Sequence, residues 1–249
     1  MSHEVRLVPL PGIPEVTRDA DLAALLLAAA ERAGVSLGNG ALVVCQKIIS
    51  KAEGRIVDLS QVDPSEEACR IAAEDDKDPR HIEVVLRESA RLVRHGHGIM
   101  ICETHHGYIC ANAGVDLSNA PGPEVAVLLP HDSDASAAKL RAELVKRGAG
   151  PLAIVVSDTF GRPWREGLVD VALGASGIDP IKDRRGSLDR SGRELQVTAT
   201  ATADQLAAAA GLLMPKDSGV PAVWVEGVPI EGDGRVADTL RNPDDDLFR

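Results

Sequence analysis

Apolar and polar residues follow two periods along the chain, one typical of buried strands and one typical of amphipathic helices. Unbroken apolar runs at residues 41–45 and 152–156, each preceded by turn-forming residues, predict strands that are buried on both faces. Further strands are expected in the segments "EVRLVPL", "LVDVALGASG" and "VPAVWVEGV". A hairpin is expected over residues 98–114, and a turn at residues 189–192 should lead into another strand.

Helical periodicity marks segments that alternate with these strands. They cover residues 18–34, 64–76, 80–92, 134–148 and 202–214. Asp19 or Thr17 can cap the first helix. Asp134 or Ser136 can cap the helix at residues 134–148, and Thr202 begins a spacing typical of a capping box. Because strands and helices alternate without a repeat or a linker, we expect one domain of the α/β or mixed α+β class over residues 1–249.

The composition is that of an ordinary globular chain with an acidic excess. Hydrophobic residues make up 44% and aromatic residues only 2%, so aliphatic side chains must build the core. The formal net charge of -11 argues against nucleic acid or an anionic membrane as a partner, although an anionic small molecule needs only local positive charge. No apolar run approaches the roughly 20 residues of a membrane span, and a signal-peptide pattern is missing. We therefore expect a cytoplasmic protein.

Common motifs of nucleotide and catalytic sites are missing from the sequence. It contains no GxxxxGK[ST] loop, no GxGxxG after a strand, no HExxH and no GxSxG. None of the four cysteines forms a CxxC pair, so we expect reduced, buried thiols rather than a zinc site. They are Cys45, Cys69, Cys102 and Cys110. The adjacent His105 and His106 should point apart in a hairpin turn, which favours a surface position over metal binding.

Polar residues follow the apolar run at residues 152–156 without a spacer. Asp158 and Thr159 lie at the expected end of this strand, and Arg162 and Arg165 follow in the expected loop. Strand ends are where α/β proteins bind ligands, and carboxylate and hydroxyl oxygens suit a hard divalent cation. An Asx-type turn, in which the same side chains only cap the loop, is the alternative that the residues alone leave open.

Two other segments offer complementary chemistry. In the segment "ANAGVDLSNAPG", Asp116 supplies a second carboxylate and Asn119 an amide that suits a base or ribose edge, although a surface loop rich in turn formers would look the same. Lys47 and Lys51 lie four residues apart after the strand at residues 41–45. They would share one helical face and could hold phosphate oxygens, and a solvated face is the alternative.

Basic residues concentrate between residues 162 and 193 despite the negative net charge. Arginine binds carboxylates and phosphates through paired hydrogen bonds, whereas ion pairs with the abundant acidic residues are the structural alternative. The basic residues are Arg162, Arg165, Lys182, Arg184, Arg185, Arg190 and Arg193. Together with the separated acids and the lysine pair, they favour metal-assisted phosphoryl chemistry on an anionic substrate.

Longer motifs in a specific order give this combination a family context. The segments "SKAEGR", "ANAGVDLSN", "SDTFGRPWREG" and "DRSGRELQVT", in this order and at these separations, resemble the coenzyme F420-0:L-glutamate ligase family. The resemblance extends from about Gly12 to Val225. It implies a family-specific two-lobed α/β ligase fold, distinct from P-loop, Rossmann and ATP-grasp enzymes, and an intertwined homodimer.

The resemblance also implies a reaction. Such an enzyme uses GTP and a divalent metal, magnesium or manganese, and adds L-glutamate by γ-linkage to the deazaflavin coenzyme F420-0 and to F420-1. The path runs through an acyl phosphate and releases GDP and phosphate, and a monovalent cation such as potassium is a further expected cofactor. A related ligase for another carboxylate substrate or amino acid, and a non-catalytic nucleotide-binding protein, are the alternatives.

The family motifs assign roles to individual positions of this sequence. They imply that Asp116, Asp158 and Thr159 bind metal, and that Asp158, Thr159 and Arg162 are catalytic. The implied nucleotide contacts are Ile13, Pro14, Glu15, Val16, Gln46, Lys51, Asn119 and Lys216.

Two of these positions depart from the family pattern. Gln46 stands where the family often has serine or threonine, and it can still form a hydrogen bond, although with a longer reach. Lys216 lies near a position where some relatives have a metal-binding glutamine. Because a protonated lysine cannot bind metal, we expect Lys216 to contact phosphate instead.

Overall fold

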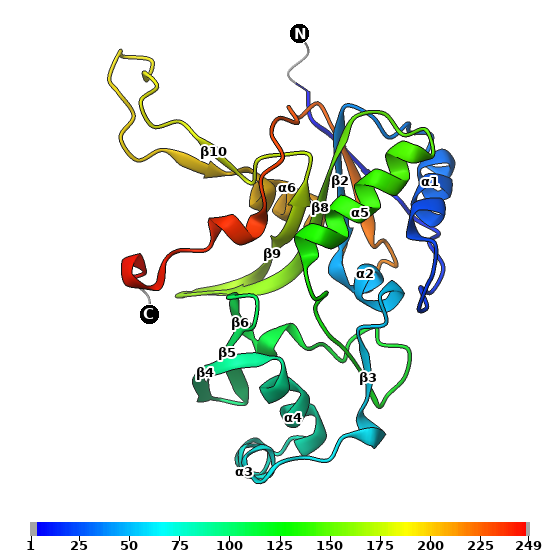
Figure 1. Cartoon of the computed structure of the whole chain (residues 1–249), viewed down its shortest axis with the longest axis vertical. Helices are drawn as coiled ribbons and strands as arrows, with labels where there is room; N and C mark the ends of the chain where they lie inside the picture. The colour runs from blue at the N-terminus through cyan, green and yellow to red at the C-terminus, as the bar shows by residue number, and fades with distance from the viewer. Residues whose placement is uncertain (1–3, 248–249) are drawn as a thin grey trace.

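A five-stranded mixed sheet lies at the centre of the computed structural model, which describes residues 4–247 (Figure 1). Its strand order is β1–β12–β2–β8–β9. The strands are β1 (Arg6–Pro9), β12 (Ala222–Glu226), β2 (Gly40–Cys45), β8 (Leu152–Arg162) and β9 (Arg165–Ser176). β2 and β8 run parallel, and the other neighbouring pairs are antiparallel. The apolar pattern of the sequence predicts a strand at each of these five places.

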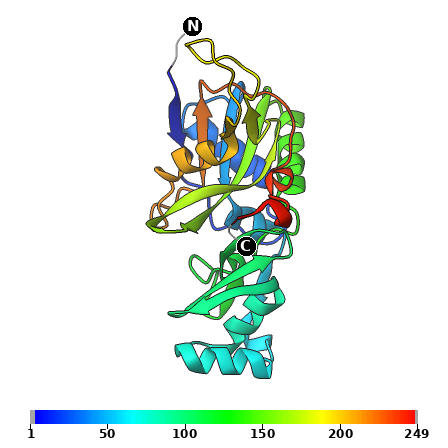
Figure 2. The same cartoon turned by 90° about the vertical axis from the view of Figure 1, so that its left-hand side faces the viewer.

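Helices cover both faces of the central sheet (Figure 2). α1 (Leu22–Arg32) and α5 (Ser133–Lys146) lie on one face, and α6 (Thr202–Gly211) lies on the other. α2 (Gln46–Ala52) continues directly from the end of β2. Strands covered on both faces need apolar residues at every position, which explains the unbroken apolar runs in β2 and β8.

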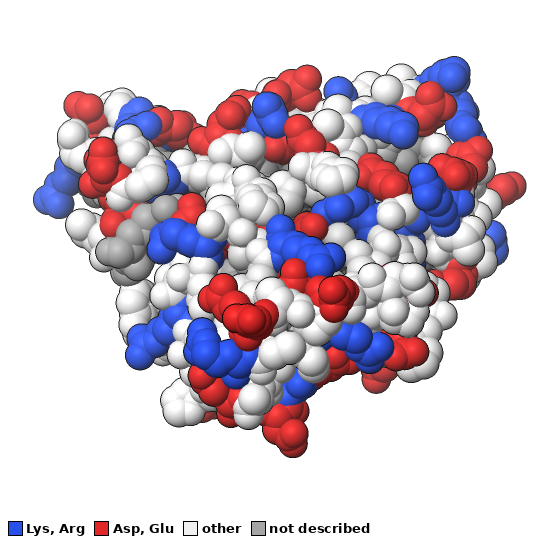
Figure 3. Space-filling model, turned by 60° about the horizontal axis from the view of Figure 1, so that its bottom comes forward, with Lys and Arg blue, Asp and Glu red and all other residues white. Residues whose placement is uncertain are grey.

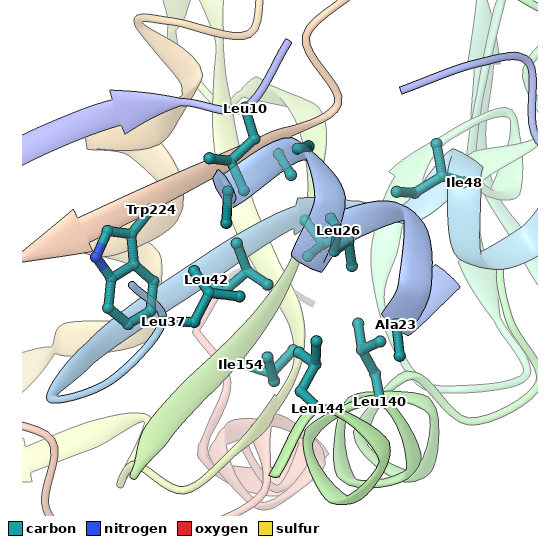
Figure 4. Close-up of a cluster of buried hydrophobic side chains, with 14 of the residues drawn as sticks. Leu10, Ala23, Leu26, Leu37, Leu42, Ile48, Leu140, Leu144, Ile154 and Trp224 are labelled. Atoms are coloured by element: carbon teal, nitrogen blue, oxygen red, sulfur yellow. The ribbon is translucent and has the colours of Figure 1, made fainter. Parts of the chain in front are cut away.

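Alternation along the strands divides the apolar residues between two cores. Leu42 and Val44 of β2 pack with α1 and α5, whereas Ala41 and Val43 pack with α6. Figure 4 shows the first of these cores, in which the fully buried Trp224 of β12 lies near Leu42 of β2 and near Leu37, which precedes that strand. Aliphatic side chains supply most of its remaining volume, as the scarcity of aromatic residues predicts.

A third hydrophobic cluster lies in the segment between β3 and β7, below the central sheet in Figure 1. The segment contains β3 (Ile56–Asp58), α3 (Glu66–Asp75), α4 (Pro79–Arg87), β4 (Ser89–Gly96), β5 (Ile99–Thr104), β6 (Ile109–Ala111) and β7 (Val125–Val127). β3 pairs with β7, and β4, β5 and β6 form a three-stranded antiparallel sheet. The hydroxyl of Tyr108 donates to the carbonyl of Leu173 at 2.6 Å and so ties this segment to β9.

The remaining elements are short. β10 (Ile181–Asp183) and β11 (Ala199–Ala201) pair in an extension that projects from the central sheet (Figure 1). The 3₁₀ helices are η1 (Leu59–Gln61), η2 (Asn112–Gly114), η3 (Val236–Thr239) and η4 (Pro243–Asp245). The described residues thus form a mixture of helices and several sheets, which confirms the predicted class. Within residues 4–247, no helix is long and apolar enough to cross a membrane.

Several local predictions were wrong at the ends of helices. The helix expected over residues 80–92 ends at Arg87, because the chain from Ser89 onward pairs with β5 as a strand. The carboxylates of Asp21 and Asp132 cap α1 and α5, each two residues away from the nearest predicted cap. Thr202 forms no capping box, because its hydroxyl donates to the carbonyl of Thr200 at 3.4 Å.

Asp134 has a different role from the cap that the sequence suggests. Its Oδ1 accepts hydrogen bonds from the backbone N–H groups of Ala175 and Val236, at 2.8 and 2.9 Å, and its Oδ2 accepts one from Ala237. The buried carboxylate therefore joins α5, β9 and η3. Val236 is buried in the core beneath α6, so the polar C-terminal segment contributes more to packing than its composition indicates.

β8 also extends beyond the end that the sequence predicts. Its parallel pairing with β2 stops at Ser157, but residues 158–162 continue as a strand that pairs with β9 alone. Asp158 and Thr159 therefore lie within a hairpin and not at a strand tip followed by a loop. The prediction failed because the polar residues end the apolar pattern, while the backbone hydrogen bonds to β9 keep the strand conformation.

Gly174 of β9 packs directly against the first turn of α5. A Cβ atom at Gly174 would lie 2.2 Å from the carbonyl carbon of Ser133, which no side chain tolerates. We predict that Gly174→Ala lowers the free energy of unfolding by about 1–3 kcal/mol, as denaturant titration would show. At Gly161 of β8 a Cβ meets no atom within 4 Å, so Gly161→Ala is the matched control. Equal losses in the two variants would contradict the packing argument.

Candidate active site

A cavity of about 390 Å³ opens where the parallel pairing of β2 and β8 ends. Its wall combines α2, β8 and β9 with two loops that are distant in sequence, residues 13–16 and 214–221. The predicted site residues that line it are Ile13, Pro14, Glu15, Val16, Lys51, Asn119, Asp158, Thr159 and Lys216. The fold therefore brings together segments that the sequence keeps up to about 200 residues apart.

Lys47 and Lys51 both line the cavity from one face of α2, as their spacing predicts. Their exposed fractions are only 8% and 5%, so the alternative of a solvated face is wrong. The Lys47 ammonium lies 2.7 Å from Oδ2 of Asp116, and the Lys51 ammonium lies 2.5 Å from Oε1 of Glu15. The two buried lysines are each paired with a carboxylate, and their ammonium groups are donors that an anionic ligand at the cavity could also use.

Asp116 is held by two ammonium groups at once. Besides Lys47, the Lys216 ammonium lies 3.3 Å from the same carboxylate oxygen. Partial burial alone would raise the pKa of Asp116, but the hydrogen bonds from Lys47 and from the N–H of Ser118 lower the pKa to about 2. The carboxylate is therefore ionised and attracts positive charge. Its neighbour in the loop, Asn119, donates to the carbonyl of Lys216 at 3.1 Å, which joins the two loops across the cavity.

Asp158 lies in the opposite electrostatic situation. Burial raises the pKa of Asp158 to about 7, the negative charges of Asp116 and Asp170 add to this effect, and the N–H of Thr159 and the Lys47 ammonium offset part of it. The negative charge of Asp116 thus acts on Asp158. A carboxylate with so high a pKa is a common feature of functional sites, because positive charge from a ligand would stabilise its ionised form.

Thr159 forms a hydrogen bond with Asp170, a residue to which the sequence analysis assigned no role. Its hydroxyl donates to Oδ1 of Asp170 on β9 at 2.7 Å, and both residues line the cavity. Thr159 and Asp170 are direct partners in the β8–β9 ladder. The sequence does contain a signal, since Asp170 is an acidic residue inside the apolar strand segment "LVDVALG", but only the register of the hairpin connects it with Thr159.

Three predicted site residues, Asp116, Gln46 and Arg162, are not among the residues that line the cavity. Gln46 is fully buried, and its Oε1 accepts a hydrogen bond from the hydroxyl of Ser50 at 2.7 Å. The Arg162 guanidinium donates to the carbonyls of Glu166 and Gly167 in its own hairpin. The other basic residues of the 162–193 cluster lie on the hairpin or on the β10–β11 extension and its turn, where Arg185, for example, pairs with Asp183. Their roles stay predictions.

Charged side chains of both signs are mixed on one face of the molecule. Acidic and basic side chains are interspersed on the face shown in Figure 3, and this view shows no broad area of a single sign. Long-range attraction of a polyanion needs such an area. Local positive charge therefore comes from the lysines in the cavity wall.

The donors around the cavity suit a hard cation that is bound together with a phosphate ligand. Within residues 4–247, no group of three or more His, Cys, Asp and Glu side chains is arranged to hold a metal ion. Asp158 and Thr159 nevertheless line the cavity with oxygen donors, and Asp116, which pairs with Lys47 and Lys216, lies beside it. Magnesium commonly uses one or two carboxylates and completes its shell with substrate phosphates. The residues present therefore fit the predicted divalent cation.

Comparison with known proteins decides the family. The sequence model of the F420-0:Gamma-glutamyl ligase family matches residues 12–227. The chain belongs to this family. It is 44% identical to the coenzyme F420:L-glutamate ligase of Methanothermobacter thermautotrophicus, over 98% of this chain and 99% of that protein. Identity to the enzymes of that name from Methanopyrus kandleri and Archaeoglobus fulgidus is 42% and 38%, over 98% of this chain in both cases.

Membership confirms the resemblance seen in the motifs and makes the chain an enzyme of the ligase class. It also excludes the alternative of a non-catalytic nucleotide-binding protein. The matched region includes the cavity-lining segments from residue 13 to residue 221. The assignments of individual residues to metal, nucleotide or catalysis stay predictions.

Cys45 offers a chemical test of the cavity's electrostatics. Burial and the nearby Asp158 raise the pKa of the Cys45 thiol to about 11, so well under about 1% of it is thiolate at pH 8. We predict that iodoacetamide at pH 8 alkylates the exposed Cys69 long before Cys45, as a time course of peptide mass spectra would show. Alkylation of Cys45 at the same rate as Cys69 would contradict the described environment.

Proposed function

We propose that this ligase adds L-glutamate by γ-linkage to coenzyme F420-0, and then to F420-1, with GTP as the co-substrate. Support for the acceptor and the amino acid comes from the relatives above, which are named coenzyme F420:L-glutamate ligase and align along almost their entire length. Support for the nucleotide comes from the cavity, which the buried Lys47 and Lys51 and the carboxylate of Asp158 line, while Asp116 pairs with Lys47 beside it. This convergence is the observation that carries the proposal.

The proposed reaction has two steps. The acceptor carboxylate attacks the γ-phosphorus of GTP, the bond to the β-phosphate oxygen breaks, and GDP leaves. The glutamate amine then forms a C–N bond at the acyl carbon, the C–O bond to phosphate breaks with its electron pair, and the nitrogen loses a proton. Activation is needed because a carboxylate would otherwise have to expel oxide, whereas an acyl phosphate expels phosphate.

The residues of the cavity suggest a division of roles. We propose that Lys47, Lys51 and Lys216 hold phosphate oxygens, since ammonium groups are strong donors to them. Residues 13–16 and Asn119 would bind the rest of the nucleotide. Arg162 lies on the same hairpin as Thr159, and we propose that it meets the anionic tail of the acceptor.

Asp116, Asp158 and Thr159 would hold magnesium or manganese, and potassium is proposed as a further ion. A bound divalent ion would neutralise charge on the phosphate oxygens during transfer. A bound cation would favour the ionised form of Asp158, and it would take the place of ammonium groups as the partner of Asp116. We further propose that the enzyme acts in the cytoplasm as an intertwined homodimer of two-lobed subunits.

Purified protein tests the proposal directly. With GTP, manganese, L-glutamate and F420-0, we expect one GDP for each glutamyl unit that the acceptor gains, measured by chromatography and mass spectrometry. Asp158→Ala should abolish both products while circular dichroism stays unchanged, because a side chain at the cavity wall contributes little to packing. Wild-type rates in that variant would exclude the role of Asp158, and a panel of other carboxylates and amino acids would reveal a different substrate.

Lys51 should serve the nucleotide more than the acceptor. We predict that Lys51→Met weakens GDP binding by about 10-fold or more, because it removes a charge-assisted hydrogen bond in a buried wall. Isothermal calorimetry measures this affinity. Lys139→Met, which alters an exposed lysine of α5, is the control and should bind GDP as the wild type does. Equal affinities in both variants would show that Lys51 only pairs with Glu15.

A further inference from the structure

The contact between Thr159 and Asp170 has a defined direction. The two residues face each other across β8 and β9, and 2.7 Å separates Oγ1 of Thr159 from Oδ1 of Asp170. An ionised carboxylate can only accept hydrogen bonds, so the hydroxyl hydrogen must point at Asp170. The lone pairs of the hydroxyl oxygen then stay available to the cavity that both residues line.

The Asp170 carboxylate packs against the C-terminal end of α6. A Cβ atom at Gly211, the last residue of α6, would lie 2.7 Å from Oδ2 of Asp170, so this oxygen packs closely against the helix end. A second carboxylate of α6, Asp204, accepts a hydrogen bond at 2.9 Å from the N–H of Ala172. α6 therefore anchors β9 beside Asp170 and leaves no room at Gly211 for a side chain.

We propose that Asp170 is a positioning residue that fixes the Thr159 hydroxyl as an acceptor, so that its oxygen can bind a divalent cation. The inference rests on the proposed metal-dependent function and adds a residue to it. Neither the motifs nor the pattern of apolar residues assigns a role to Asp170. Partners that orient a metal-binding side chain in this way typically change metal affinity about 10–100-fold when they are replaced.

Manganese binding in the presence of GDP tests the proposal without turnover. We expect Asp170→Asn to weaken manganese binding about 10-fold or more in calorimetry, because the amide can donate to Thr159 and occupy a lone pair. Thr159→Val should show a similar loss, and Thr159→Ser, which keeps the hydroxyl, should stay close to the wild type. Since Asp170 acts through Thr159, the double variant should be no weaker than Thr159→Val alone.

Two further variants separate orientation from stability. Gly174→Ala disturbs the contact between β9 and α5, whose residues Gly174 and Ser133 do not line the cavity, and should lower stability without changing manganese affinity. Gly211→Ala keeps every polar group but displaces the Asp170 carboxylate, so it should weaken manganese binding as Asp170→Asn does.

The outcomes distinguish this inference from the proposed function. If the wild type with GDP binds no manganese, the metal-dependent function fails. If the wild type binds manganese and Asp170→Asn binds it equally well, the positioning role is wrong. If the losses of Asp170→Asn and Thr159→Val multiply in the double variant, Asp170 acts independently of Thr159, for instance as a ligand itself, and the positioning role is again wrong.

Discussion

The parallel pairing of β2 with β8 is the constraint on which the other features of this enzyme depend. Both strands are covered by helices on both faces, so their apolar residues are buried and their register is fixed. At Cys45 the chain leaves β2 and turns into α2, whereas β8 continues and pairs with β9 alone. The cavity lies where β8 no longer pairs with β2. Asp158 and Thr159, the next residues of β8, line it.

The two buried lysines of α2 then determine which loops lie at the cavity, because each lysine pairs with a carboxylate from a distant segment. Lys47 and Lys51 emerge from the end of β2 into a poorly solvated wall, where an ammonium group needs a partner. Asp116 and Glu15 supply these partners from segments 69 and 36 residues away. The same ion pairs that stabilise the lysines therefore hold the two loops at the cavity, and a phosphate ligand could take the place of either carboxylate as the partner of a lysine.

The sequence predicted where helices and strands lie more accurately than it predicted the residues at which they begin and end. Apolar runs identified all five strands of the central sheet, and the longer motifs identified the family. The hairpin position of Asp158 was missed because polar residues can continue a strand when a neighbour supplies the hydrogen bonds. The buried state of Lys47 was left open, because a four-residue spacing describes a helix face without saying whether that face meets solvent.

The sequence by itself determined the secondary-structure class, the strands with unbroken apolar runs and the family, because these depend on local periodicity and on motifs that are contiguous in the chain. Only the tertiary structure decided which distant side chains share the cavity. The pairing of Thr159 with Asp170 requires the register of the β8–β9 hairpin, and that of Lys47 with Asp116 requires two separate segments to meet. Such contacts follow from backbone pairing and from the cost of burying charge, neither of which a local pattern contains.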